Sequence, residues 1–233
     1  MSHEPPRYVH ALRYRLLNAA YDPVVALTTR ERRLKTMLLD VVGLSGESRV
    51  LDLGCGTGTL AVLAKQRLPG LDMHGIDGDG AMIERARRKA RRAGVEAGFR
   101  TAMAGNLPYA DASFTHVLTS LFLHHLTPAD KRQALAEARR VLCPGGTLGI
   151  ADWGVPSNRM LRGLFLIVQI LDGFEATRDH AAGRLPWFVA QAGFVDVREA
   201  GRLATGLGSL TVLLADNPGS DSVSSTPILE KRR

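Results

Sequence analysis

Apolar positions follow two different periods along most of the chain. Five short apolar runs have the length of buried strands, and they lie at 50–53, 72–76, 98–103, 114–119 and 147–151. Between them, apolar residues recur every three or four positions in longer segments at 59–68, 81–93 and 127–142. Strands that alternate with helices of this length predict a parallel sheet with helices on both faces.

The C-terminal part departs from this alternation. After a predicted helix at 187–192, two apolar runs at 194–199 and 210–215 have no helical spacing between them. They predict an antiparallel strand pair, which brings the sheet to seven strands. Gly, Ser, Pro and charged residues dominate from Asn217 onward, so residues 217–233 are expected to form a disordered tail.

The N-terminal part reads mostly as helix, with a break at Asp22-Pro23. We therefore predict a helical cap over residues 1–42 and a single α/β domain over residues 43–216. An insertion at 155–185 is apolar on nearly all sides between Met160 and Gly173. It is expected to form a lid, with packing in the core as the competing interpretation.

A glycine-rich stretch, RVLDLGCGTGTLA, lies between the first strand and its helix. In an open α/β sheet this is where a ligand meets backbone N–H groups. The dinucleotide fingerprint needs a glycine where this chain has Thr59, and no Gly-Lys-Ser/Thr phosphate loop is present. Asp52 followed by alternate glycines instead suits a ligand with an ammonium, which Asp52 attracts, and a carboxylate, which the backbone binds.

VLDLGCGTG resembles the first motif of the class I S-adenosylmethionine-dependent methyltransferases, and the resemblance extends from about Leu34 to Ala215. It implies a Rossmann-like fold, S-adenosyl-L-methionine as methyl donor and S-adenosyl-L-homocysteine as product. The loop residues implied to bind this cofactor are Asp52, Gly54, Cys55, Gly56, Thr57 and Gly58. Asp77, at the end of the second strand and followed by Gly78, is expected to bind the ribose hydroxyls.

The same resemblance implies further contacts with the cofactor. Met103 and Ala104 are placed to cover the adenine, although the family usually has Asp or Asn where this chain has Met103. A thioether accepts the hydrogen bond of the adenine amine poorly. Ser120 aligns with a cofactor-contacting position of the quinone-methylating enzymes. Tyr21 is a candidate to close over the cofactor, with core packing as the favoured alternative.

Asn106-Leu107-Pro108-Tyr109 is similar to the tetrapeptide with which amine-methylating enzymes bind their target. In those enzymes the tetrapeptide ends the fourth strand, whereas here it precedes the run at 114–119. It matches instead the Leu-Pro-Phe element of small-molecule methyltransferases. We therefore interpret 107–109 as structural.

Candidates for catalysis follow the fourth and fifth strands. His124 and His125 come after the fourth strand, and His125 is the one expected to face the transferred methyl group. Asp152 follows the fifth strand and is a candidate base or orienting group. The alternatives are that the histidines pack or cap a helix and that Asp152 is a turn residue. Adjacent histidines do not have the i, i+4 spacing of a helical metal site, so no metal is predicted.

The expected acceptor is a small apolar or aromatic molecule. The two other functions left open are methylation of RNA and binding of the cofactor without catalysis. The arginine-rich helix at 81–93 has an apolar face formed by Met82, Ala86, Ala90 and Ala93, as a solvated surface helix does. No aromatic residues lie between its charges, so nucleic acid is not the expected partner.

Composition limits the cellular setting. The 233 residues carry a net charge of +7 and two cysteines, Cys55 and Cys143, without metal-ligand spacing, which favours a reducing compartment. The first ten residues lack an apolar signal region. The most apolar stretch, 164–171, is far shorter than the roughly 20 residues of a membrane span. We therefore expect a cytoplasmic protein, either a monomer or a homodimer, without a membrane span.

Overall fold

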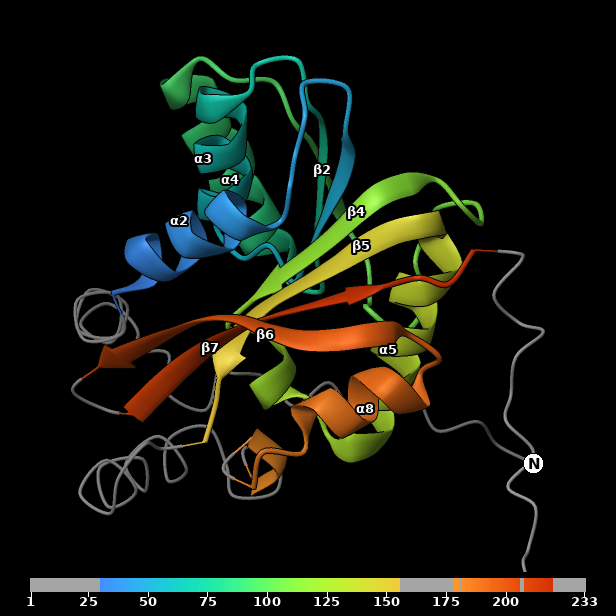
Figure 1. Ribbon diagram of the computed structural model, residues 1–233. Coiled ribbons are helices and arrows are strands. Elements are labelled where there is room, and N and C mark those ends of the chain that lie inside the picture. The colour runs from blue at the N-terminus through green and yellow to red at the C-terminus, as the bar shows by residue number, and fades with distance from the viewer. Residues whose placement is uncertain (1–29, 156–177, 181, 206–207, 220–233) are drawn as a thin grey trace, which may run out of the picture.

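The computed structural model describes residues 30–155, 178–180, 182–205 and 208–219 (Figure 1). Most of the predicted N-terminal cap, including Tyr21, and most of the predicted lid, including its apolar stretch, lie outside these residues. The same holds for 220–233 of the predicted tail.

Seven strands form one sheet in the order β3-β2-β1-β4-β5-β7-β6. Their bounds are β1 Arg49–Leu53, β2 Asp72–Asp77, β3 Gly98–Thr101, β4 Phe114–Ser120, β5 Leu142–Trp153, β6 Val195–Thr205 and β7 Gly208–Asp216. β1 to β5 pair in parallel, whereas β7 pairs antiparallel with both β5 and β6. The predicted Rossmann-like fold with a C-terminal antiparallel pair is confirmed.

Helices cover both faces of this sheet (Figure 1). Their bounds are α2 Glu31–Val41, α3 Thr59–Arg67, α4 Gly80–Ala93, α5 Pro128–Val141 and α8 Leu185–Gln191, with a short 3₁₀ helix, η2, at Leu123–His125. The apolar sides of α2, α3 and α4 share one core with β-strand residues such as Val50 and Leu118. α5 and α8 share the other core with residues such as Leu51 and Val117. Successive strand residues thus alternate between the two cores, as the pleat of a sheet requires.

The strand order reverses between β1 and β4, since the chain runs from β1 outward to β3 and then returns to β4. The segments that follow β1 and β4 leave this point in opposite directions, and in open α/β sheets the opening between them is the usual ligand site. The glycine loop follows β1 and Ser120 ends β4. The topology therefore brings the predicted cofactor residues to one edge of the sheet.

Several boundaries differ from the sequence prediction; β6, for example, extends to Thr205, whereas the predicted strand ended at residue 199. β5 begins at Leu142 rather than at Thr147, because Leu142 also pairs with Phe114 and the strand continues through Pro144-Gly145-Gly146. Asn217, the predicted start of the tail, is held on β5. Its N–H donates to the Gly146 carbonyl at 2.8 Å, and its side-chain amide donates to the Leu142 carbonyl at 2.9 Å.

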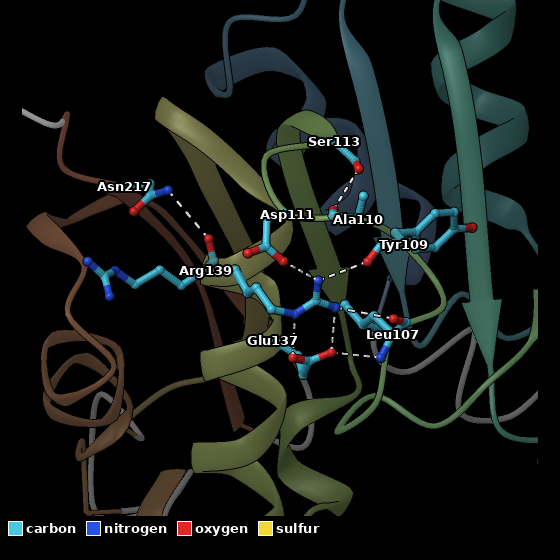
Figure 2. Close-up of polar contacts among 9 residues, drawn as sticks. Leu107, Tyr109, Ala110, Asp111, Ser113, Glu137, Arg139 and Asn217 are labelled. Carbon is cyan, nitrogen blue, oxygen red and sulfur yellow. Dashed lines mark hydrogen bonds and ion pairs between the residues drawn. The ribbon is translucent and has the colours of Figure 1, made fainter.

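Figure 2 shows how the segment 107–111 is fixed to α5. Arg140 donates to the carbonyl oxygens of Tyr109 at 2.8 Å and of Leu107 at 3.2 Å, and to Asp111 Oδ1 at 2.7 Å. It also forms a two-point pair with Glu137, whose Oε2 accepts the Leu107 N–H at 2.7 Å. Every one of these contacts is internal, which supports the structural interpretation of Leu107-Pro108-Tyr109.

Val117 gives a test of the two-core arrangement. It is fully buried at the centre of the sheet on β4. Val117→Ala is expected to lower the free energy of unfolding by about 2 kcal/mol, since it removes buried methyl groups and leaves a small cavity. The matched control is Val195→Ala at an exposed position of β6, which should change it by less than about 0.5 kcal/mol. Urea denaturation measures both, and equal effects would contradict the described core.

Candidate functional site

The glycine loop between β1 and α3 has the backbone conformation that only glycine adopts readily. Gly54 and Gly56 have φ values of 71° and 52°. A Cβ atom on Gly54 would come within 2.3 Å of the Phe122 ring, so the loop lies directly against the segment after β4. At Gly56 a Cβ atom would meet nothing within 4 Å, which leaves the middle of the loop open to a ligand.

Asp52 lies near the end of β1 and is 1% exposed. Neither of its carboxylate oxygens has a hydrogen-bond partner among the described residues. Burial raises the pKa of Asp52 to about 7; Lys35 opposes this shift, while Asp77 and Glu31 add to it. A buried carboxylate without a partner is costly, and a ligand ammonium would supply the missing charge and donors. The donor set therefore fits the amino-acid end of S-adenosylmethionine.

Asp77, at the end of β2, connects this strand to the glycine loop. Its Oδ2 accepts the Gly56 N–H at 2.9 Å, and its Oδ1 accepts the Asp79 N–H at 2.9 Å. Burial raises the pKa of Asp77, although these two N–H groups act against the shift. Each carboxylate oxygen keeps a lone pair for a further donor. The side chain is thus held beside the loop in a place that suits ribose hydroxyls, and Gly78 is exposed next to it.

Two other predicted loop residues have side chains that interact with the protein itself. The Cys55 thiol is buried, and burial together with Asp52 and Asp77 raises its pKa, so it stays protonated. Thr57 Oγ1 accepts a hydrogen bond from Lys89 Nζ of α4 at 2.7 Å. A role of Cys55 and Thr57 in cofactor binding therefore stays a prediction and concerns their backbone groups. Gly58, with φ 73°, ends the loop against Ala86 of α4.

The remaining predicted cofactor residues lie at the same edge. Met103 follows β3 and is 47% exposed, the largest value among the large apolar side chains of the described residues. Ala104 is next to it, and Ser120 is buried at the end of β4. Contacts of these three residues with adenine or cofactor stay predictions. No contact of Tyr21 is described, because it lies outside the described residues.

The structure brings the three catalytic candidates together. Asp152 Oδ1 is 2.6 Å from His124 Nδ1 and accepts the Trp153 N–H at 2.7 Å, while Oδ2 accepts the His124 N–H at 3.3 Å. His124 and Asp152 are buried, whereas His125 is exposed. The His125 ring lies against the His124 ring, with 3.9 Å between their centroids. An oriented, accessible imidazole thus lies in front of a buried histidine–aspartate pair.

The charge of this buried pair follows from its neighbours. Burial alone would raise the pKa of Asp152, but His124 and His180, with the hydrogen bonds from His124 and Trp153, lower it below its ordinary value. Asp152 is therefore ionised and serves as an acceptor. Because Asp152 is buried and hydrogen-bonded to His124, the geometry fits an orienting group better than a base that faces an acceptor molecule, and either role stays a prediction.

Sequence reasoning missed three members of this cluster. His180 is 1% exposed, and its Nε2 lies 3.8 Å from Asp152 Oδ2. Asp179 Oδ2 lies 3.6 Å from Nζ of Lys131, a fully buried residue of α5. Asp179 and His180 lie near the C-terminal end of the predicted lid (155–185), where two adjacent polar residues after an apolar stretch were the only signal. Within the described ranges, no group of three or more His, Cys, Asp or Glu side chains is arranged to hold a metal ion.

Comparison with known proteins agrees with this geometry. A family model described as a methyltransferase domain matches residues 50–146. Demethylmenaquinone methyltransferase of Thermus thermophilus is 37% identical over 146 residues, which are 63% of this chain and 63% of that protein. The chain thus spans slightly less than two thirds of that relative's length.

An uncharacterized methyltransferase of Synechocystis is 31% identical over 210 residues, which are 87% of this chain and 95% of the relative. A solved SAM-dependent methyltransferase of Methanosarcina mazei has the same fold, with a TM-score of 0.62 at 22% identity, over 76% of this chain and 95% of that one. The chain belongs to the class I S-adenosylmethionine-dependent methyltransferase family. In the part of the chain that the structure describes, no helix is long and apolar enough to cross a membrane.

The raised pKa of Asp52 predicts that the free energy of unfolding depends on pH. Between about pH 4 and 7 the folded chain keeps a proton on Asp52 that the unfolded chain has already released. The free energy of unfolding of the cofactor-free protein should therefore decrease as pH rises through this window, by about 1.4 kcal/mol per pH unit. Asp52→Asn removes this contribution, so the difference between wild type and variant in urea denaturation should depend on pH.

The same variant should bind S-adenosylmethionine more weakly, by about tenfold or more in calorimetry, because the amide lacks the charge that attracts the ammonium. Asp40→Asn, at an exposed carboxylate of α2, is the matched control and should alter neither quantity strongly. Parallel pH curves for wild type and Asp52→Asn would contradict the described environment of Asp52.

Proposed function

We propose that the protein transfers the methyl group of S-adenosylmethionine to a small apolar or aromatic acceptor. The observation that carries the proposal is the Asp52 carboxylate, buried without a described partner beside an open glycine loop. The loop lies against Phe122, two residues before the buried His124–Asp152 pair. A donor site and a candidate acceptor site thus meet at the reversal point of the sheet.

When bound, S-adenosylmethionine supplies a methyl group on a sulfonium, which is already a good leaving group. The work left to the chain is to orient two molecules and exclude water. Asp52 and the loop N–H groups would hold the amino-acid end of the cofactor, and Asp77 would hold its ribose. His125 would accept the proton of an acceptor hydroxyl or amine as it attacks, while His124 and Asp152 keep the His125 ring in place.

Two observations support an apolar or aromatic acceptor: the name of a relative and the apolar side chains near His125. The Thermus relative carries the name of an enzyme that methylates demethylmenaquinone, a quinone. The exposed His125 and the apolar side chains of Phe122 and Leu121 follow β4 together. The apolar insertion after β5, predicted as a lid, would add to this lining.

RNA is the less favoured acceptor. The apolar side of α4, formed by Ile83, Ala86 and Ala90, is buried against the sheet. Arg87 of this helix is engaged internally, with Glu84 at 2.6 Å and the Phe99 carbonyl at 2.8 Å. The helix packs on β2 and β3, on the far side of the glycine loop from Asp152. Its arginines therefore suit a solvated surface rather than an acceptor site.

The first test separates binding from turnover. Calorimetry should detect S-adenosylmethionine and S-adenosylhomocysteine, and methyl-labelled donor should pass its label to an acceptor in a panel of quinone precursors, phenols and amines. Label entering RNA would replace the proposal by RNA methylation. Binding without turnover on any acceptor would support a non-catalytic role, and absence of binding would refute the donor assignment itself.

The second test concerns His125. His125→Gln should lower kcat by about 100-fold or more if the acceptor must lose a proton, with the Kd for S-adenosylmethionine unchanged. His74→Gln, on β2 away from the pair, is the matched control and should keep kcat. An unchanged kcat in His125→Gln would show that catalysis rests on positioning alone.

A further inference from the structure

A third imidazole faces the buried histidine–aspartate pair from a separate part of the chain. His180 Nε2 lies 3.8 Å from Asp152 Oδ2, whereas Asp152 Oδ1 is occupied by His124. The His180 ring stands at 86° to the His124 ring, with 6.1 Å between centroids. One carboxylate therefore has an imidazole at each of its two oxygens.

His180 is a polar side chain that its own surroundings do not satisfy. It is 1% exposed, and neither ring nitrogen has a hydrogen-bond partner among the described residues. Burying such a group costs free energy unless a nearby charge or acceptor offsets the cost. The ionised Asp152 is the group that does so here, which explains why a histidine rather than an apolar residue occupies this buried position.

The segment that carries His180 has an anchor of its own. Asp179 Oδ2 lies 3.6 Å from Lys131 Nζ on α5, and Asp179 Oδ1 lies 3.4 Å from Arg184 Nη1 at the start of α8. Lys131 in turn lies over the Phe188 ring of α8, 5.5 Å from its centroid. These contacts hold residues 178–180 on α5 and α8 without help from the His180 ring. Replacing that ring should therefore leave the segment in place.

We propose that His180 is a positioning residue of the methyl-transfer site, which holds the second oxygen of Asp152 and so fixes the His124 ring against which His125 lies. The role deepens the proposed function and rests on it. Without His180, Asp152 Oδ2 keeps only the 3.3 Å hydrogen bond from the His124 N–H, so the carboxylate is held less firmly about its last bond. The His124 ring that hydrogen-bonds to it would then lose its single orientation, and His125 would lose its support.

At neutral pH, His180 acts on Asp152 through its position and its N–H group rather than through a positive charge. Burial lowers its pKa to about 4, Asp152 and Asp179 act against the shift, and His124 and Lys131 add to it. Together with His125, these four groups are the charged or titratable ones near the ring among the described residues, and they lie on η2, β5, α5 and its own segment. The imidazole is therefore neutral at pH 7 and directs an N–H dipole, not a cation, at Asp152.

The test uses two substitutions of His180 that differ in whether the new side chain can donate a hydrogen bond to Asp152. His180→Leu removes the donor, whereas His180→Gln places an amide N–H near the position of Nε2. In protein saturated with S-adenosylhomocysteine, ¹⁵N spectra of the histidine rings report the tautomer of His124. The wild type and His180→Gln should show a single tautomer with the proton on Nδ1, and His180→Leu should show a mixture.

Turnover with the acceptor found in the panel gives the second readout. His180→Leu should lower kcat about tenfold with little change in the KM for S-adenosylmethionine, and His180→Gln should recover most of the loss. His116→Leu, on β4 near its amino end, is the matched control for removing a histidine and should leave the His124 signals unchanged.

Three results would overturn the proposal. The first is an unchanged His124 tautomer in His180→Leu, and the second is an unchanged kcat in that variant. The third is an equal loss of kcat in His180→Leu and His180→Gln at temperatures where circular dichroism shows both variants folded. The spectroscopic readout needs no acceptor, so it separates a failure of this proposal from a failure of the proposed function.

Discussion

Two carboxylates buried at the carboxyl edge of the sheet constrain the rest of the site. Asp52 on β1 and Asp152 on β5 are each 1% exposed, and an uncompensated charge at such a position destabilises the fold. The carboxylates of Asp52 and Asp152 differ in how their charge is compensated. Asp152 receives hydrogen bonds from His124 and from the Trp153 N–H, so its charge is balanced within the chain. Asp52 has no such partner among the described residues, and burial raises its pKa to about 7.

This difference divides the edge into a completed part and a part that a ligand completes. The completed part is the His124–Asp152 pair, whose hydrogen bond is made within the chain. The other part, around Asp52 and the open face of Gly56, gains stability when a cation occupies it. The sheet topology makes the two parts neighbours, because β1 and β4 are adjacent where the strand order reverses.

Local patterns were enough to predict the fold and to place the candidate donor residues at one edge of the sheet. The strands and helices from β1 to β4 follow from apolar periodicity, and Asp52, Asp77 and the glycines lie within one motif and its neighbouring strand end. The length of β5 could not be predicted from its own residues, since it is set by pairing with Phe114 and with β7. The place of Asn217 was missed for the same reason: its partners lie more than 70 residues earlier in the chain.

Long-range contacts between side chains account for the rest of what the sequence could not show. Lys131, Asp152 and the adjacent pair Asp179-His180 lie far apart in the sequence, and they meet only because α5, α8 and β5 pack together. His124 and Asp152 were predicted separately from their strand ends. That they form one hydrogen-bonded pair, with His125 alone exposed, required the packed structure.

The close approach of Gly54 to the Phe122 ring has a consequence for how this site can change over evolutionary time. The donor loop and the histidine-bearing segment share one van der Waals contact that admits no added atom on Gly54. A substitution that shifts one of them is therefore expected to shift the other. New acceptor preferences that leave the donor site intact must arise in elements outside this contact, such as the segment that ends at His180 and the start of α8. A lineage of such proteins would keep its methyl donor while its acceptors diversify.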